Sequence, residues 1–296
     1  MSTPRESILL GLIGDGITTS LTPPMQEQEA AEHGLLLLYR PVDTAALGLD
    51  GDAAQQEAPR LMEYGRRLGF NGFNVTHPFK QTIMGHLDVI DEDAKALGAV
   101  NTVIFDDQGR AHGYNTDFSG YITGLRAAVP DADLANVVQL GAGGAGAAVA
   151  YALLRAGTDT LTVIDLDSSR ATALAEELQS RFPESVVRAR PYAELQGALL
   201  TATGFAHSTP VGMHSHPGMP VEIDWIPDGA WVSDVVYLPI KTELVEAARA
   251  RGLSVMDGGR MAVGQAVDAF ALFTGLQADP ERVESHFARL AEKTQG

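Results

Sequence analysis

The chain has 296 residues, of which 45% are hydrophobic, and this length is sufficient for two packed domains. Its formal net charge of -17 argues against a general electrostatic affinity for nucleic acid or for an anionic membrane. The absence of cysteine excludes disulfides, thiolate catalysis and cysteine-ligated metals. No apolar run approaches the roughly 20 residues that span a bilayer, and no signal-peptide pattern opens the chain, so we expect a cytoplasmic protein.

The first part of the chain alternates strand-length apolar runs with helical segments. Strands are expected at residues 8–14, 35–39, 70–76, 100–105 and 112–114. Helices are expected from about Pro23 and over residues 60–68, and the turn at 106–109 joins two strands as a hairpin. This pattern predicts an α/β unit with a mixed sheet.

The Pro-containing stretch 129–133 marks a seam, after which strands and helices alternate regularly. The expected strands lie at residues 137–140, 160–165, 185–189, 203–207, 231–236 and 253–256. This alternation predicts a parallel, doubly wound sheet of the Rossmann type. The last apolar helix, from Ala262 to Leu276, is expected to cross back and pack on the first unit, which lacks a closing helix.

These patterns predict two domains with a cleft between them. Residues 1–121, completed by the helices within 262–296, would form a substrate-binding domain. Residues 122–261 would form an NAD-binding Rossmann domain. Polar residues gather at strand ends and turns of the first domain, which is where binding and catalytic groups concentrate in such folds.

A glycine-rich turn follows the first strand of the second domain. Its sequence is Gly141-Ala142-Gly143-Gly144-Ala145-Gly146, in the strand–turn–helix setting of the G-x-G-x-x-G fingerprint. The first glycine permits the tight turn, the second lets the backbone approach a pyrophosphate, and the third lets helix and strand pack closely. Free amides at the helix N-terminus would face the phosphates. Glycine-rich packing without a ligand is the alternative, but the setting favours dinucleotide binding.

The next strand of this domain ends in Asp165-Leu166-Asp167. An acidic residue at this distance from the first glycine is placed to bind the adenosine ribose hydroxyls, and it would repel the 2′-phosphate of NADP. No basic residue stands where it would clamp that phosphate, since Arg170 lies deeper in the following helix. We therefore expect NAD as the cofactor, with Asp165 and Asp167 at its ribose.

Lys80 is the only amine within a cluster of polar side chains in the first domain. The other members are Asn74, Thr76, Asn101, Asn115, Thr116 and Asp117. A neutral lysine could take the proton of a hydroxyl group as hydride leaves, with Asp117 beside it. A surface lysine is the alternative for Lys80. His77 is interpreted as structural, and the histidines lack metal-ligand spacing, so no metal is expected.

Segments spread over nearly the whole chain resemble the shikimate/quinate dehydrogenase family. They are Gly11–Gly14 with Ser20–Pro23, Asn74–Lys80, Gly98–Thr102, Gly113–Asp117, the glycine turn, Ser208–Met213, Asp234–Tyr237 and Gln265–Ala266. The resemblance implies a substrate domain, a Rossmann domain, and a pyridine-nucleotide dehydrogenase that acts on a hydroxylated cyclohexane acid.

The resemblance also implies roles for single residues. Ser20 and Thr22 would hold the substrate carboxylate, with Tyr237 nearby, although turn and helix-capping roles are the alternative for both hydroxyls. Thr76, Asn101, Asp117 and Gln265 would bind the ring hydroxyls, although a helix-capping or buried amide is the alternative for Gln265. Asn74 and Lys80 would also contact the substrate, and Lys80 and Asp117 would be the catalytic pair. The remaining cofactor contacts would come from Thr209, Val211, Met213, Val235 and Gly258.

Three positions depart from the family's usual pattern. Thr22 stands where shikimate-specific members typically carry serine, and it resembles members that also oxidise quinate. Asp165 replaces the basic cluster of NADP-using members, and His207 replaces an asparagine near the nicotinamide. We expect an NAD-dependent oxidoreductase of quinate, shikimate or both, monomeric or homodimeric, in either biosynthesis or catabolism. An aminoshikimate-type dehydrogenase and a non-catalytic ligand sensor are the alternatives.

Overall fold

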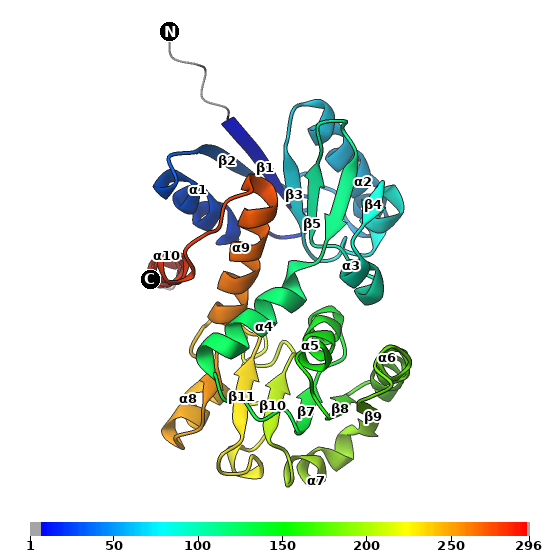
Figure 1. Cartoon of the computed structure of the whole chain (residues 1–296), viewed down its shortest axis with the longest axis vertical. Coiled ribbons are helices and arrows are strands. Elements are labelled where there is room, and N and C mark those ends of the chain that lie inside the picture. Colours follow the sequence, from blue (N-terminus) through cyan, green and yellow to red (C-terminus); the bar gives the residue numbers. More distant parts are fainter. Residues whose placement is uncertain (1–6, 295–296) are drawn as a thin grey trace. The chain divides into compact units, whose positions relative to one another are not determined.

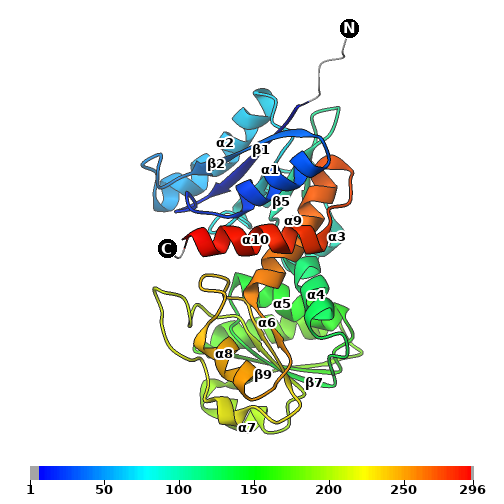
Figure 2. The same cartoon turned by 90° about the vertical axis from the view of Figure 1, so that its left-hand side faces the viewer.

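The computed structural model describes residues 7–294 of the chain (Figures 1 and 2). The chain divides into two compact units, one made of residues up to Thr116 together with Ala266–Glu292, and the other of Asp117–Gln265. Over the described range each unit holds a six-stranded sheet with helices packed on it, which confirms the predicted α/β class. Between residues 7 and 294 no helix is both long and apolar enough to cross a membrane.

The first unit is built on a mixed sheet with the strand order β2-β1-β3-β5-β6-β4. Strands β2, β1 and β3 run parallel, whereas β5 is antiparallel to both β3 and β6, as predicted for the hairpin. The elements are β1 (Ser7–Gly14), α1 (Thr22–Glu32), β2 (Leu36–Asp43), α2 (Gly51–Arg67), β3 (Gly72–Val75), β4 (Val89–Ile90), α3 (Glu92–Leu97), β5 (Thr102–Phe105), β6 (Ala111–Tyr114), α9 (Gly258–Thr274), which belongs to this unit from Ala266 on, and α10 (Pro280–Thr294).

Helix α2 begins at Gly51, well before residue 60, where the sequence pattern predicted it. The helix passes through Pro59, although proline removes a backbone donor and commonly ends a helix. Ala58, Pro59 and Met62 are buried on the face that packs on the sheet, and this burial outweighs the lost hydrogen bond. The two-residue strand β4 was not predicted, because it is too short to show a periodicity.

An aromatic ring fills a hollow between α2 and the sheet. A Cβ atom on Gly11 of β1 would lie 2.2 Å from the ring of Phe73, and one on Gly65 of α2 would lie 2.3 Å from it. Both positions therefore require glycine for steric reasons, not for backbone freedom. The Phe73 ring is 1% exposed and stacks on Phe70 at 4.9 Å between centroids, which fixes α2 on β1 and β3.

The second unit is a sheet of parallel strands in the order β12-β11-β10-β7-β8-β9, of which Figure 1 labels the strands from β11 to β9. Counted in sequence from β7, this is the order 3-2-1-4-5-6 of dinucleotide-binding folds, with the switch point between β7 and β10. The elements are α4 (Thr116–Ala128), β7 (Asn136–Leu140), α5 (Gly144–Arg155), β8 (Thr160–Asp165), α6 (Ser168–Arg181), β9 (Val186–Pro191), α7 (Leu195–Leu199), β10 (Gly204–His207), β11 (Trp231–Asp234), α8 (Glu243–Ala250) and β12 (Val255–Met256). The predicted doubly wound sheet is thus confirmed.

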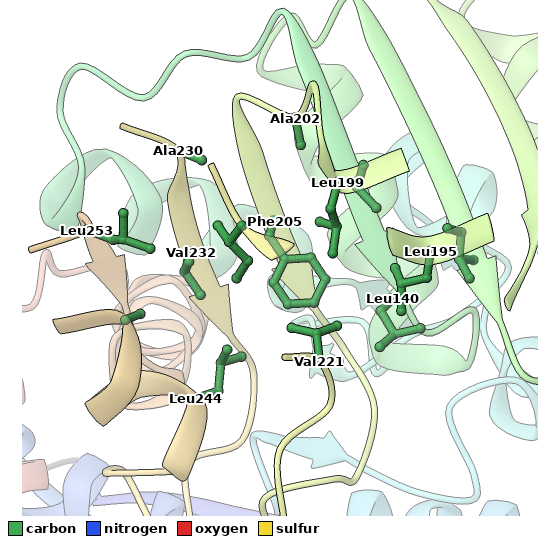
Figure 3. Close-up of a cluster of buried hydrophobic side chains, with 14 residues drawn as sticks. Leu140, Leu195, Leu199, Ala202, Phe205, Val221, Ala230, Val232, Leu244 and Leu253 are labelled. Carbon is green, nitrogen blue, oxygen red and sulfur yellow. The ribbon is translucent and has the colours of Figure 1, made fainter. Parts of the chain in front are cut away.

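Phe205 lies within the core on one face of this sheet (Figure 3). It clusters with Leu140 of β7 and Val232 of β11, under the helices α7 and α8. Alternate strand residues point to the other face, where the Gln139 amide donates to the Gly146 carbonyl of α5 at 2.8 Å. Helices therefore cover both faces, and the carboxyl ends of β7 and β10 are held side by side.

Candidate active site

Three segments of the first unit meet at one edge of its sheet. The Val75 amide donates to the Asn101 carbonyl at 2.8 Å, and the Asn101 amide donates to the Tyr114 carbonyl at 3.0 Å. These bonds join the end of β3, the start of β5 and the end of β6, because β5 is antiparallel to both neighbours. The fold thus brings the predicted site residues of this unit to one edge: Thr76, Lys80, Asn101, Asn115 and Thr116.

Asn101 connects β5 to the start of α4. Its Nδ2 donates to the Thr116 hydroxyl at 3.1 Å, and its Oδ1 accepts the Thr116 amide at 2.8 Å and the Thr102 hydroxyl at 2.9 Å. The Asn101 side chain is 4% exposed. Because Thr116 opens α4, this network fixes where that helix begins and so where Asp117, in its first turn, is placed.

Asn74 supports the sheet edge through its side-chain amide. Its Oδ1 accepts the Tyr39 hydroxyl at 2.5 Å, and its Nδ2 donates to the Asn101 carbonyl at 3.2 Å and to the Thr102 hydroxyl at 2.9 Å. Both amide protons of Asn74 and one lone pair of its Oδ1 are thus used inside the protein, and burial also raises the pKa of the Tyr39 phenol. These bonds assign Asn74 a supporting role at the sheet edge.

The backbone of Lys80 is held by a hydrogen bond, and that of Asp117 by a helical turn. The Lys80 carbonyl accepts the Val100 amide at 2.8 Å, which fixes its backbone next to the start of β5. The Lys80 side chain is half-buried, so it is not the fully exposed surface lysine of the alternative interpretation. Asp117 is 7% exposed and lies in the first helical turn, where the helix dipole stabilises a negative charge.

Asp43 shapes the loop that leads to Ser20 and Thr22, a role that sequence reasoning missed. Its carboxylate accepts the Gly16 amide at 2.9 Å, the Thr18 amide at 3.0 Å and the Thr18 hydroxyl at 2.6 Å. Burial raises the pKa of the Asp43 carboxyl, but these hydrogen bonds outweigh burial and hold the pKa below its usual value. Asp43 lies four positions past the strand expected at 35–39, so no sequence pattern marked this role.

Ser20 and Thr22 stand at the start of α1. The Ser20 Oγ accepts the Thr22 amide at 3.3 Å, and Leu21 is the N-cap residue, without a side-chain cap bond. Ser20 accepts this bond with a lone pair, so its proton is free of that interaction and can be donated. Hydroxyl donors beside a helix N-terminus suit the binding of a carboxylate.

The glycines of the second unit's turn have the separate roles that the motif predicts. Gly141 has φ +111°, which only glycine adopts readily, and a Cβ on it would lie 2.6 Å from the Ser208 carbonyl oxygen. A Cβ on Gly146 would lie 2.2 Å from the Gly141 oxygen, so α5 packs directly on the turn. A Cβ on Gly143 or Gly144 would meet nothing within 4 Å. That open space, at the N-terminus of α5, fits a dinucleotide pyrophosphate.

Asp165 lies at the carboxyl end of β8, against the glycine turn. Its carboxylate accepts the Ala142 amide at 2.7 Å and the Asp167 amide at 2.8 Å. Asp167 is the N-cap residue of α6 and accepts the Ser169 amide at 3.0 Å. Asp165 is therefore at the position expected for a ribose-binding carboxylate and also supports the turn, whereas Asp167 is engaged in capping a helix.

The segments after β10 and β11 form the other side of the switch point. A Cβ on Gly141 would lie 3.1 Å from Cγ2 of Thr209, so Thr209 borders the glycine turn, and Val211 and Met213 follow it. Gly258 packs on the segment after β11, where its Cβ would lie 2.7 Å from the Val235 carbonyl oxygen. Thr209 therefore lies beside the glycine turn, and Val235 and Gly258 pack on each other after the end of β11.

Tyr237 and Gln265 belong to the same unit as Asp117. Tyr237 follows β11 and is 42% exposed. Gln265 lies on α9, which crosses α4 at a pair of glycines: a Cβ on Gly264 would lie 2.4 Å from the Gly120 carbonyl oxygen. This close crossing, one turn after Asp117, sets the position of Gln265 relative to α4. Sequence reasoning missed Gly120 and Gly264, which lie far apart in the chain.

Comparison with known proteins agrees with this architecture. Residues 12–103 match the family described as the shikimate dehydrogenase substrate binding domain. A shikimate dehydrogenase (NADP(+)) of Pseudarthrobacter chlorophenolicus is 56% identical over 98% of this chain and 97% of its own length. A quinate/shikimate dehydrogenase (NAD(+)) of Corynebacterium glutamicum is 46% identical over 97% of this chain and 100% of its own.

A solved structure extends the comparison to three dimensions. The quinate dehydrogenase from Corynebacterium glutamicum in complex with NAD superposes with a TM-score of 0.90 and 46% identity, over 96% of this chain and 99% of that one. The fold, the glycine turn and these relatives define an oxidoreductase that uses a pyridine nucleotide. The chain belongs to the shikimate/quinate dehydrogenase family.

Proposed function

We propose that this protein catalyses the reversible, NAD-dependent oxidation of the C3 hydroxyl of quinate, shikimate or both to the 3-dehydro acid. The observation that carries the proposal is the polar cluster at the ends of β3, β5 and β6, which offers an amine, amides and hydroxyls to a polyol. The relatives named as quinate/shikimate dehydrogenases support the choice of substrate.

Each group in the two units has a proposed task. Lys80 takes the C3 hydroxyl proton, and Asp117 is its acidic partner. Thr76, Asn101 and Gln265 offer hydrogen bonds to ring hydroxyls, while Ser20, Thr22 and Tyr237 donate to the carboxylate. A bound nicotinamide supplies the hydride acceptor. The methyl group of Thr22 reshapes the carboxylate pocket relative to serine, which favours activity on quinate as well as shikimate.

The choice of NAD rests on Asp165. A carboxylate at the end of β8, beside the Ala142 amide, can accept a ribose hydroxyl and repels a 2′-phosphate. The nearby cation, Arg170, lies 3.4 Å from Asp167 and is engaged with that acidic residue. NADP is the second candidate, because the relative from Pseudarthrobacter chlorophenolicus is named for it.

Initial rates with four substrate–cofactor pairs test the proposal: quinate and shikimate, each with NAD and with NADP. We expect activity on both acids with NAD and much lower kcat/KM with NADP. Equal kcat/KM values for the two cofactors would contradict the choice of NAD. No activity with any pair would contradict the proposed reaction.

A further inference from the structure

A buried hydrogen-bonded chain runs across the ends of β10 and β11. The Nδ1 of His207 lies 2.9 Å from Oδ1 of Asp234, and its Nε2 lies 2.5 Å from the Thr209 hydroxyl. His207 is 0% exposed and Asp234 is 1% exposed. A charged carboxylate is costly to bury unless it is paired and hydrogen-bonded, as Asp234 is here.

The groups around Asp234 determine which atoms of this hydrogen-bonded series donate and which accept. The Thr242 hydroxyl donates to its Oδ2 at 2.6 Å, and the Val236 amide donates to its Oδ1 at 3.0 Å. Because a carboxylate only accepts, Nδ1 of His207 carries a proton and donates as well. A neutral imidazole with its proton on Nδ1 leaves Nε2 to accept the proton of the Thr209 hydroxyl, which fixes the Thr209 rotamer.

The Thr209 end of this hydrogen-bonded series lies at the proposed cofactor site. The Thr209 Oγ1, having donated to His207, accepts the Val211 amide at 3.3 Å and so closes the turn after β10. The same residue borders Gly141, whose Cβ would lie 3.1 Å from its Cγ2. In register, His207 pairs with Leu140, so the chain lies at the switch point between β7 and β10.

We propose that His207 is a positioning residue which, oriented by Asp234, holds Thr209 and the turn 209–212 in the conformation that binds the nicotinamide end of the dinucleotide. This inference rests on the proposed function. It assigns to His207 an effect on cofactor binding through Thr209, beyond a contribution to the stability of the sheet.

Variants that remove one hydrogen bond of the Asp234–His207–Thr209 series at a time test this role. H207N keeps an amide near the position of Nδ1 for Asp234 but has no atom near Nε2 for Thr209. H207Q places a side-chain carbonyl near Nε2 and can still accept the Thr209 proton. T209V removes the hydroxyl while keeping the shape. H86N, at an exposed histidine of the first unit, is the matched control.

The readouts are the dissociation constant of NADH by fluorescence titration, the KM values for NAD and for substrate, and the midpoint of thermal unfolding. We expect H207N and T209V each to weaken NADH binding about five- to tenfold, the effect of one lost hydrogen bond. The double variant H207N/T209V is expected to be no weaker than either single variant, and H207Q is expected to bind NADH more tightly than H207N. The KM for substrate is expected to stay unchanged.

Wild-type NADH affinity in H207N overturns the inference, even if that variant unfolds at a lower temperature, because His207 would then be purely structural. Multiplying effects in the double variant also overturn it, since His207 would not act through Thr209. A wild-type protein that binds neither NADH nor NADPH would instead contradict the proposed function itself, and the inference with it.

Discussion

The buried carboxylate of Glu29 in α1 is gripped by the guanidinium of Arg282 in α10, with Nε 2.9 Å from Oε2. The Asp279 amide and the His33 ring also lie within hydrogen-bond distance of this carboxylate. Figure 2 shows α1 and α10 as neighbouring helices of the first unit. Burial raises the pKa of Glu29, but its partners, Arg282 first, outweigh burial and hold the pKa below the ordinary 4.5.

This contact predicts an acid-sensitive contribution to stability. Because the folded-state pKa of Glu29 is lowered, its contribution is present above pH 4.5 and is lost as the pH falls below that value. At neutral pH, E29Q is expected to lower the free energy of unfolding by about 1–3 kcal/mol, below the range for fully buried pairs, because Arg282 is 31% exposed. Urea unfolding should show the gap between wild type and E29Q narrowing at acid pH, with E281Q as the control. A constant gap would contradict the prediction.

The role of Asp43 in the 16–18 loop predicts that its substitution weakens the binding of substrate but not of the dinucleotide. D43N leaves one acceptor oxygen and turns an amide group toward the donors of the 16–18 loop, so the loop before Ser20 is expected to loosen. The KM for quinate or shikimate should rise about tenfold, as for a lost charged hydrogen bond, while the KM for the dinucleotide stays the same. The exposed variant D50N is the control. An equal rise in both KM values would remove the assignment of this loop to substrate.

The proposed role of Lys80 predicts that its substitution lowers kcat while substrate and NADH still bind. K80M is expected to reduce kcat by about 10²–10⁴-fold, the usual contribution of a general acid or base. Substrate and NADH should still raise the midpoint of thermal unfolding, because the other proposed contacts remain. K95M removes an exposed lysine of the same unit and serves as the control. Nearly full activity in K80M would sink the proposed proton transfer.

Asp165 predicts a change in cofactor preference. D165S removes the carboxylate that is proposed to accept a ribose hydroxyl, so the KM for NAD is expected to rise about tenfold. The same substitution frees the Ala142 amide, which on its own would weaken NAD and NADP equally. The ratio of kcat/KM for NAD over NADP separates the two effects. A fall in this ratio supports the ribose role, and an unchanged ratio leaves Asp165 as a support of the turn only.

The glycine turn could be predicted from sequence because its geometry is local. Gly141 and Gly146 restrict each other across five positions, so the motif and its following helix already contain the constraint. The strand-end cluster could be predicted for a similar reason, since each polar group follows or precedes a recognisable strand. Periodicity alone does not show that the glycine turn and the strand-end cluster serve one site. The resemblance to a known family indicates that they do.

The supporting residues could not be predicted, because their partners are distant in the chain. Asn74 has a polar side chain of the kind that binds ligands. Its amide contacts Tyr39 and Thr102, and only the sheet register brings these two residues next to it. Asp43 controls a loop that begins 27 positions earlier, at Gly16. Asp167 shares its strand end with Asp165, and only the structure shows that it caps α6.

The first unit is assembled from the two ends of the chain, since Gln26 of α1 donates to the Ala266 carbonyl of α9 and Glu29 binds Arg282. During synthesis, α1 therefore leaves the ribosome long before the helices that cover it. The second unit is continuous in sequence and can fold first, while Gln26 and Glu29 of α1 still lack their partners. A released fragment of residues 1–265, which ends with the second unit, should be protected from protease in that unit and cleaved in α1. Protection of α1 in this fragment would show that it folds without its distant partners.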